Sequence, residues 1–368
     1  MQHVSDSPAP RPQRDSVHVL DLFAGAGGLT QGFHSASNRF QVVRAVEEDL
    51  AAAASYARTF GDKVYPGGIE GWLADEEVPH VGIVVGGPPC QGFSTLGKQD
   101  AEDKRNTLWR EYVQAVSKAR PGYFVLENVP AFQRTPQFEL FRNAVGRGGE
   151  LADYTFTPYV LNAADYGAPQ ARKRVVVIGH HRDLPEPGKP EPTHVRGHVT
   201  VAEALREALP AVTETELPET RTEFCGRSFP GAFKTAELHL TRNYTATSLA
   251  RFATIPPGGN RFHIPEELLS SCWKKHKSGS GDVMGRLSPD KPSVTIRTEF
   301  FKPEKGRYLH PTENRALTHY EAALLQGFPD DYQWVGSKVS IARQIGNAVP
   351  VPLARAIAKH LLGAIDKN

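Results

Sequence analysis

The chain has little cysteine and no long hydrophobic run. Its three cysteines, Cys90, Cys225 and Cys272, are too few and too widely spaced for a disulfide framework. No Cys or His group has the spacing of zinc ligands. No run approaches the roughly 18 apolar residues that a membrane span needs. These absences favour a reducing compartment, so we expect a cytoplasmic protein with no metal and no membrane partner.

An excess of charge of one sign is also lacking. The 43 Lys and Arg residues are balanced by 41 Asp and Glu residues, and the net charge is +2. The total therefore does not indicate nucleic acid binding. The distribution is uneven, however, because residues 221–277 interleave basic and aromatic side chains, as a phosphate-contacting surface does. An ordinary solvated surface is the alternative.

Size and composition are typical of a soluble globular protein of two domains. Residues 1–16 are polar and Pro-rich, which predicts a disordered tail. Residues 17–182 and 336–368 alternate strand and helix patterns, which predicts a parallel, doubly wound α/β sheet. Residues 183–335 begin with a Pro-rich and Gly-rich linker and are irregular, which predicts a second, smaller domain. The predicted strands are 17–23, 42–46, 81–85, 123–126 and 175–178, and the predicted helices are 29–33, 51–60, 108–119 and 351–362.

A glycine-rich turn, residues 24–28, separates the first strand from its helix. Glu47 ends the next strand, 19 residues beyond Gly28, which is close to the spacing of nucleotide sites in α/β folds. The G-x-G-G spacing differs from the dinucleotide fingerprint. It favours a nucleoside-type cofactor without phosphates, with Phe23 stacked on a purine. A turn that needs glycine only for its backbone is the alternative, and a nicotinamide oxidoreductase is a rival hypothesis.

Four further residues are candidates for chemistry. Cys90 follows a strand-like run in the strained segment GGPPCQGFS, which is typical of a reactive thiol, although an incidental loop cysteine is the alternative. Glu127 ends a buried strand at the sheet edge that binds ligands, where it could donate a proton or simply cap a turn. Arg172 and Arg174 should share one side of an extended segment, to grip a phosphate or base oxygen or to face solvent.

Taken in order, DLFAGAGG, GGPPCQGFS, ENV, QARKR and QIGNAV resemble the motif set of the bacterial C5-cytosine DNA methyltransferases. Further likeness lies in RNTL (105–108), RLSPDKPSVTIR (286–297) and LQGFPD (325–330). The resemblance covers residues 17–180 and 284–368, and residues 181–283 fall where the family keeps its variable target-recognition region. It implies a Rossmann-like, S-adenosylmethionine-dependent methyltransferase domain with a smaller, irregular target-recognition domain.

The resemblance also implies roles for individual residues. Cys90 would attack C6 of a flipped cytosine, Glu127 would hydrogen-bond N3 and N4, and Arg174 would hold O2 with support from Arg172. The implied cofactor residues are Phe23, Ala24, Gly25, Gly27, Leu29, Glu47, Ile69, Pro88, Leu108, Asn347 and Val349. The expected DNA contacts, which include basic residues of the 221–277 stretch, are Gln91, Ser94, Arg242, Arg251, Arg261, Lys274 and Lys275.

These residue types fit the implied chemistry. A thiolate added at C6 makes C5 of cytosine enamine-like, and protonation of N3 lowers the cost of that addition. The implied cofactor is S-adenosylmethionine, which leaves as S-adenosylhomocysteine. The implied substrate is double-stranded DNA, bound by a monomer in the bacterial cytoplasm and nucleoid. A cognate restriction endonuclease acting separately is a further expected partner.

Two positions depart from the family pattern. Glu48 stands where the family often has an aromatic residue that stacks on adenine, and Gly68 stands where an Asp often reads the adenine amine. The resemblance therefore does not fix the cofactor affinity. Two alternatives to a DNA methyltransferase remain, a tRNA cytosine-5 methyltransferase of the same family and a catalytically silent DNA-binding protein of the same fold.

Overall fold

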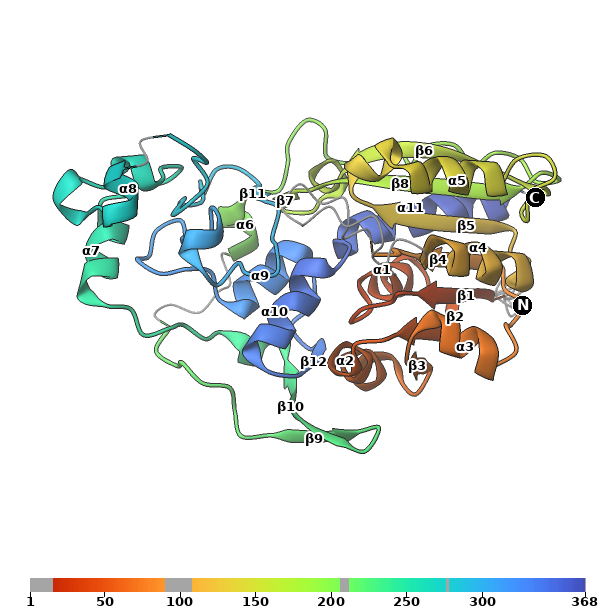
Figure 1. Ribbon diagram of the computed structural model, residues 1–368, viewed down its shortest axis with the longest axis horizontal. Coiled ribbons are helices and arrows are strands. Elements are labelled where there is room, and N and C mark those ends of the chain that lie inside the picture. The colour runs from red at the N-terminus through yellow and green to blue at the C-terminus, as the bar shows by residue number, and fades with distance from the viewer. Residues whose placement is uncertain (1–15, 90–107, 206–211, 276–277, 368) are drawn as a thin grey trace, which may run out of the picture.

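The computed structural model describes residues 16–89, 108–205, 212–275 and 278–367. Figure 1 shows a helix-covered sheet on the right and a part with fewer strands on the left. Almost all of the tail predicted for residues 1–16 lies outside the described residues.

A seven-stranded sheet forms the right-hand part, in the order β3-β2-β1-β4-β5-β8-β6. Its strands are β1 (Val17–Leu22), β2 (Phe40–Glu47), β3 (Val64–Pro66), β4 (Ile83–Gly86), β5 (Tyr123–Asn128), β6 (Tyr154–Asn162) and β8 (Lys173–His181). Strands β1 to β5 pair in parallel, whereas β8 is antiparallel to both β5 and β6. The expectation of a parallel sheet is therefore wrong for β8. Only residues 163–172 connect β6 to β8, too few for the crossover that parallel neighbours need.

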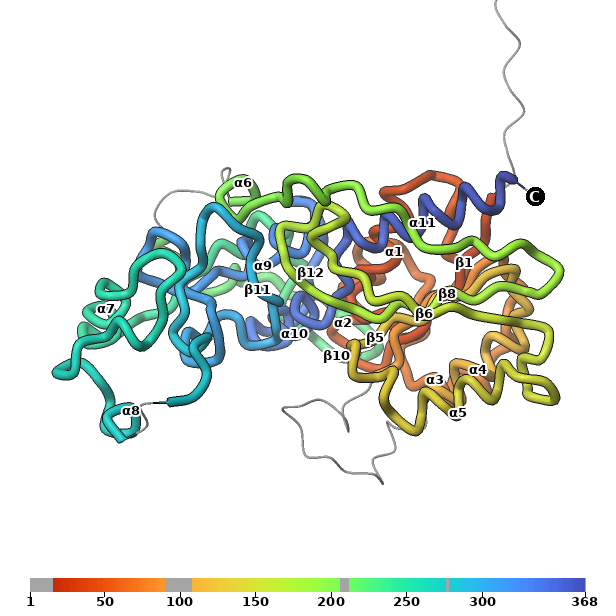
Figure 2. The backbone as a smooth tube through the Cα atoms, turned by 90° about the horizontal axis from the view of Figure 1, so that it is seen from above, coloured from red at the N-terminus to blue at the C-terminus, as the bar shows by residue number. Residues whose placement is uncertain are grey.

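Helices cover both faces of this sheet because successive strand residues point to opposite sides. In β1, Val17 and Val19 enter one core, and Leu20 and Leu22 enter the other. The first core is closed by α1 (Gly28–Ala36), α2 (Leu50–Phe60) and α11 (Val351–Ile365). The second core is closed by α3 (Ile69–Asp75), α4 (Leu108–Ala119) and α5 (Pro136–Ala144). Figure 2 shows α1 and α11 on one side of the sheet and α3, α4 and α5 on the other, so the domain is doubly wound.

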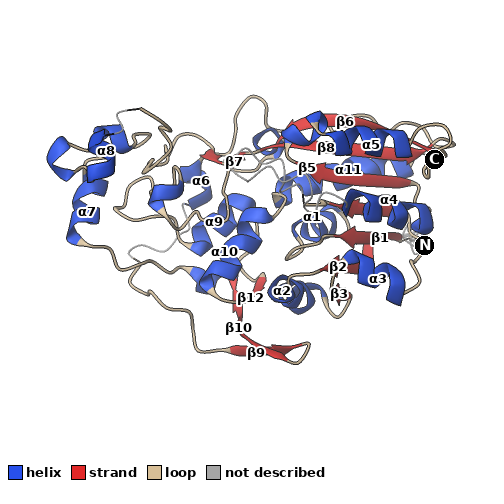
Figure 3. Cartoon of the chain, viewed as in Figure 1, coloured by secondary structure: helices blue, strands red, loops and turns tan. Residues whose placement is uncertain are grey.

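The left-hand part has its own hydrophobic core and is rich in loops, as Figure 3 shows. Strands β9 (Arg221–Phe224), β10 (Arg227–Lys234) and β12 (Gln333–Val335) form an antiparallel sheet in the order β12-β10-β9. The helices of this part are α6 (Val201–Leu205), α7 (Ala246–Ala253), α8 (Ser271–Lys275), α9 (His319–Gln326) and α10 (Lys338–Asn347). The short pair β7 (Gln170–Ala171) and β11 (Ser293–Val294) joins the two parts in parallel register.

Short 3-10 helices complete the chain. They are η3 (Pro130–Arg134), η4 (Ala163–Tyr166), η5 (Thr235–Leu238), η6 (Arg261–His263), η7 (Glu266–Leu268) and η8 (Pro303–Lys305).

The predicted domain limits, 183–335 for the smaller domain, remain a prediction. Packing is continuous across residue 335, because Trp334 before it and Ile341 after it lie in the same hydrophobic core. By length and composition, the stretch Lys338–Ile365 could also cross a membrane. It consists of two helices, α10 and α11, separated by residues 348–350, and its buried side chains pack in two protein cores.

Candidate functional site

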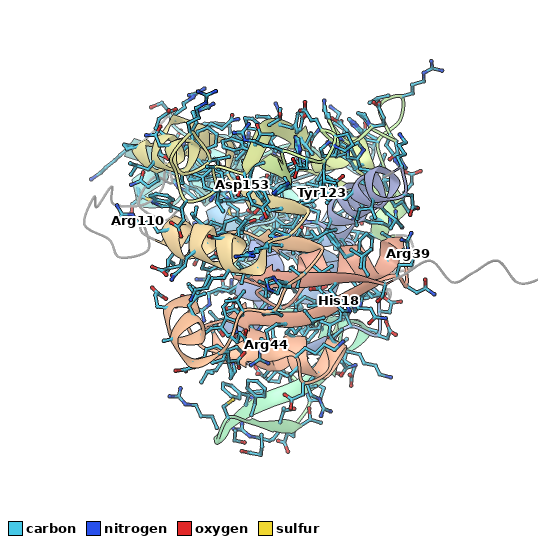
Figure 4. The ribbon with its side chains drawn as sticks, turned by 90° about the vertical axis from the view of Figure 1, so that its right-hand side faces the viewer. His18, Arg39, Arg44, Arg110, Tyr123 and Asp153 are labelled. Atoms are coloured by element: carbon cyan, nitrogen blue, oxygen red, sulfur yellow. The ribbon has the colours of Figure 1, made fainter. Side chains whose placement is uncertain are left out.

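The candidate site lies at the carboxyl ends of the parallel strands. Strand β1 has β2 on one side and β4 on the other, so the connections leave it in opposite directions. Such a switch point leaves a crevice outside the strand ends, where open α/β sheets bind ligands. In Figure 1 these strand ends point toward the left-hand part of the molecule. Figure 4 shows the opposite edge, where His18 lies next to the first residue of β1 and Tyr123 begins β5.

The glycine-rich turn leaves β1 in a tight, left-handed path. Phe23, Gly25 and Gly27 have φ angles of 56°, 58° and 98°. Glycine adopts these angles readily, but Phe23 must be held there by its surroundings at a cost of roughly 1–3 kcal/mol. A Cβ atom added at Gly25 would meet no atom within 4 Å, so the turn faces open space. Half-buried Phe23 and the Gly25 backbone can therefore receive a flat ligand.

Glu47 binds this turn to the end of β2. One carboxylate oxygen accepts a 2.8 Å hydrogen bond from the Gly25 amide, and the other accepts one of 2.8 Å from the Asp49 amide. Burial raises the pKa of Glu47 to about 7, against the effect of these two bonds. Each oxygen retains a lone pair for a ligand hydroxyl. The open turn and this carboxyl together fit the nucleoside part of S-adenosylmethionine.

The other predicted cofactor residues lie around this turn in the two cores. Ile69 and Leu108 are buried in the core against which Phe23 packs. Ala24, Leu29 and Val349 share the opposite core. A Cβ atom on Gly28 would lie 2.8 Å from the Val349 carbonyl oxygen, so α1 and the segment before α11 touch closely. Asn347 ends α10 and is exposed.

A second group of residues surrounds the segment that leads to Cys90. The Asn128 side chain donates a 2.9 Å hydrogen bond to the carbonyl oxygen of Pro88, which holds this segment against the end of β5. A Cβ atom on Gly87 would lie 3.2 Å from a carboxylate oxygen of Glu127. The backbone that precedes Cys90 therefore passes beside Glu127. Cys90, Gln91 and Ser94 lie outside the described residues.

Glu127 and Arg174 form an ion pair across strands β5 and β8. Arg174 Nε lies 2.8 Å from Glu127 Oε1, and the two side chains are only 13% and 12% exposed. Arg174 Nη1 donates to the Lys173 carbonyl oxygen at 2.8 Å. These two bonds fix the plane of the guanidinium and orient Nη2. The pair presents a fixed hydrogen-bond donor and acceptor side by side, as recognition of a planar polar ring requires.

Arg172 does not join this pair, because its guanidinium has other hydrogen-bond partners. It is buried and donates to the carbonyl oxygens of Ile296, at 2.8 Å, and Gly346, at 3.0 Å. Burial, together with the nearby charge of Arg174, lowers the pKa of Arg172 to about 9, so the guanidinium is charged at neutral pH. These contacts tie the residue between β7 and β8 to the segment that follows β11 and to α10. They give Arg172 a supporting position.

Three of the five described residues expected to contact DNA bind the protein itself. Arg242 donates to the Phe301 carbonyl oxygen, and Arg251 donates to that of Leu268. Arg261 is buried, stacks on Phe262 at 4.7 Å and donates to the Ser278 carbonyl oxygen. Lys274 and Lys275, both on α8, are exposed.

Several residues of this site were not predicted from the sequence, although some of them lie in recognisable motifs. Asp21 is fully buried beneath the glycine-rich turn, accepts a 2.6 Å bond from Thr30, and has a pKa raised to about 7 by burial. Gln170 begins the QARKR motif and bonds both Gln326 and the Ile296 amide. The identity of Asn128 was visible in ENV, but its bond to Pro88 depends on tertiary structure. Among the described residues, no three His, Cys, Asp or Glu side chains gather to hold a metal ion.

Comparisons with known proteins agree with this geometry. Residues 17–363 match the family model described as C-5 cytosine-specific DNA methylase. A Type II methyltransferase, M1.HphI of Haemophilus parahaemolyticus, is 35% identical over 94% of this chain and 87% of its own length. M.XorII of Xanthomonas oryzae pv. oryzae, a second Type II methyltransferase, is 33% identical over 95% of this chain and 85% of its own. A solved E. coli structure, described as a prophage-encoded DNA modification methyltransferase, has 26% identity and a TM-score of 0.70, covering 95% of this chain and all of that one.

Proposed function

The chain belongs to the C-5 cytosine-specific DNA methylases, and we propose that it methylates a flipped-out cytosine through a covalent bond to Cys90. It is an S-adenosylmethionine-dependent DNA (cytosine-5)-methyltransferase. This family membership replaces the hypothesis of a nicotinamide oxidoreductase. The tRNA alternative has weaker support, because the family model describes a DNA methylase.

The observation that carries the proposal is the Glu127–Arg174 pair beside the segment that leads to Cys90. A cytosine ring placed against the pair would give O2 to Arg174 and its N3–N4 edge to Glu127. The Cys90 thiolate then adds to C6, and the electron pair of the C5–C6 bond becomes available at C5. Glu127 favours a proton at N3 and so limits the charge that this addition creates.

The methyl donor fits the glycine-rich turn. When bound, S-adenosylmethionine supplies an electrophilic methyl group for C5 of the base. Glu47 would accept the ribose hydroxyls, Phe23 would contact the purine, and Ile69, Leu108 and Val349 would exclude water from the pocket walls. Once C5 carries the methyl group, its proton passes to solvent water, and the C6–sulfur bond breaks to release the free thiolate. The N3 proton returns to Glu127, which restores the neutral aromatic ring.

A base stacked in a duplex cannot reach this pocket, so the target cytosine must leave the helix. The exposed Lys274 and Lys275 on α8 would contact phosphates, whereas Arg242, Arg251 and Arg261 would hold the surrounding loops in place. Gln91 and Ser94, next to Cys90 in the sequence, remain proposed DNA contacts. Because the relatives are Type II methyltransferases, we assign the enzyme to a restriction-modification system, with the nuclease as a separate protein.

The experiment that tests this proposal compares wild type with Cys90→Ser in a tritiated methyl-transfer assay on double-stranded DNA. We expect the variant to lose at least about 10³-fold in rate, because a serine hydroxyl is far less ionised than a thiol. Cys225→Ser and Cys272→Ser are matched controls, since these two thiols are exposed, Cys225 in the turn between β9 and β10 and Cys272 on α8. A Cys90→Ser enzyme as active as wild type would contradict the mechanism, and an inactive wild type would favour the silent DNA-binding alternative.

A further inference from the structure

Four hydrogen bonds hold the glycine-rich turn of the proposed cofactor site, in addition to the bond from the Gln31 amide to the Gly27 carbonyl oxygen at the start of α1. The Ala24 amide donates to Val46 at 3.0 Å, the Gly25 amide to Glu47 at 2.8 Å, and the Gly27 amide to Ala24 at 2.9 Å. The fourth bond runs from the Tyr332 hydroxyl to the Ala26 carbonyl oxygen. The first three come from residues 24–47, whereas Tyr332 lies 306 residues further along the chain than Ala26.

Tyr332 is firmly anchored in the left-hand part of the molecule. Its carbonyl oxygen accepts a 2.9 Å bond from the Thr235 amide, and its own amide donates to Pro329 at 3.2 Å. Its ring packs against Phe328 and Trp334, with ring centres 4.7 and 5.0 Å away. All three rings are buried in one core. The hydroxyl therefore has little freedom to move away from Ala26.

The space between Tyr332 and the turn is filled. A Cβ atom added at Gly27 would lie 3.0 Å from the Tyr332 hydroxyl oxygen and 2.4 Å from the Phe60 ring. Beyond the turn, the Thr30 hydroxyl bonds Asp21 at 2.6 Å and the Tyr56 hydroxyl at 2.9 Å. The underside of the turn thus rests on a buried layer of phenol and hydroxyl groups, while its other side faces open space at Gly25.

We propose that Tyr332 is a positioning residue for the cofactor, whose hydroxyl fixes the glycine-rich turn in its binding conformation. This inference rests on the proposed function of that turn. The Ala26 carbonyl is buried and needs a donor. Without the hydroxyl, the Ala26–Gly27 peptide can turn away, and a smaller fraction of the protein is ready to bind. The apparent affinity falls in proportion to that fraction.

The bond also connects the two halves of the enzyme. Tyr332 belongs to the residues predicted to form the target-recognition domain, and the turn belongs to the methyltransferase domain. The two halves meet where β12 packs on α2, as Figure 1 shows. A displacement of the predicted target-recognition domain would therefore be transmitted to the glycine-rich turn through the Tyr332 side chain.

The test replaces Tyr332 with Phe and measures S-adenosylhomocysteine binding to the full chain by isothermal titration calorimetry. We expect the dissociation constant to rise about three- to tenfold, which corresponds to the loss of one buried hydrogen bond. In methyl transfer, KM for S-adenosylmethionine should rise by a similar factor. The kcat at saturating cofactor should stay within about twofold, because bound cofactor restores the turn.

Tyr154→Phe is the matched control. The Tyr154 hydroxyl, also buried, donates to the Pro121 carbonyl oxygen at 2.8 Å. Tyr154 begins β6, the outermost strand of the sheet, on the side where Figure 4 labels the neighbouring Asp153. This control should lower the melting temperature without changing the dissociation constant.

Three outcomes separate the ideas under test. Unchanged binding by Tyr332→Phe overturns the positioning role. Equal weakening by Tyr332→Phe and Tyr154→Phe overturns it as well, because a general loss of stability would then explain both. Failure of wild type to bind S-adenosylhomocysteine instead overturns the proposed function of the turn.

Discussion

Arg172 and Arg174 show how two residues of one motif can take different roles. Both are arginines of QARKR, and alternation along a strand predicts that they act on the same side. Arg174 extends to Glu127, whereas Arg172 donates to two backbone carbonyls of other elements. The bonds of Arg172 depend on where residues 296 and 346 lie in space, which its neighbours in sequence do not reveal. The motif indicates that arginines are needed. Only the fold distinguishes the supporting arginine, Arg172, from Arg174, which is proposed to contact the substrate.

Asp21 is the residue at which pH should act on stability. Its carboxyl has an ordinary pKa of 3.8, and burial raises this pKa to about 7. Below about pH 4 the carboxyl is protonated in both the folded and the unfolded chain. As the pH rises toward 7, the unfolded chain releases the proton first, so folding is progressively penalised. Above pH 7 the penalty is complete.

Asp21→Asn should remove this penalty, since an amide oxygen can still accept the bond from Thr30. We expect the variant to gain unfolding free energy relative to wild type between pH 4 and 7, by roughly 4 kcal/mol in total. Urea unfolding at a series of pH values measures this difference. If the unfolding free energies of the two proteins changed with pH in the same way, this would contradict the prediction that Asp21 is buried and titrates with a raised pKa.

At the scale of the element, α8 carries the exposed positive charge that the proposed DNA contacts require. Lys274→Gln with Lys275→Gln should weaken DNA binding and reduce the slope of log K against log salt by about 2 if both lysines contact phosphates. Fluorescence anisotropy with duplex DNA at several salt concentrations measures both quantities. Lys63→Gln with Lys118→Gln removes two exposed charges just before β3 and near the end of α4, at the opposite sheet edge. An equal effect from this control pair would show that only net charge matters.

Elements with a strong pattern were predictable, and weakly patterned ones were not. The helix predicted over 108–119 coincides with α4, because its apolar residues form one clear face. Strand β6 was missed, since it lies at the sheet edge, contains Pro158 and is mostly half-buried. The direction of β8 was wrong because direction depends on the connection from β6, an element that the sequence pattern did not show. Strand β3 and helix α3 were missed because they are short.

At the scale of the whole molecule, the part of the site that was predictable consists of residues at the carboxyl ends of the strands. Phe23, Gly25, Glu47 and Glu127 lie at one edge of the sheet because the carboxyl ends of the parallel strands β1, β2 and β5 share that edge. The contribution of Tyr332 was not predictable, since it crosses from one half of the molecule to the other and depends on the packing of β12 against α2. Family resemblance added the roles of residues, which geometry alone does not name.

Binding of the cofactor product should stabilise the whole molecule. At a concentration of S-adenosylhomocysteine about 100 times its dissociation constant, the unfolding free energy should rise by about 2.7 kcal/mol. The melting temperature should therefore increase by a few degrees in differential scanning calorimetry. NADH at the same concentration should leave it unchanged, because the G-x-G-G turn lacks the dinucleotide spacing. Stabilisation by NADH alone would contradict the assignment of the turn.

The most direct test of the central claim uses duplex DNA in which 5-fluorocytosine replaces cytosine. Addition of the thiolate and methyl transfer can proceed, but the fluorine on C5 cannot leave as a proton does, so the enzyme should remain covalently bound to the DNA. Peptide mapping should find the base attached to Cys90 through sulfur, in the presence of S-adenosylmethionine. Absence of an adduct under conditions that methylate ordinary DNA, or attachment at Cys225 or Cys272, would contradict the account.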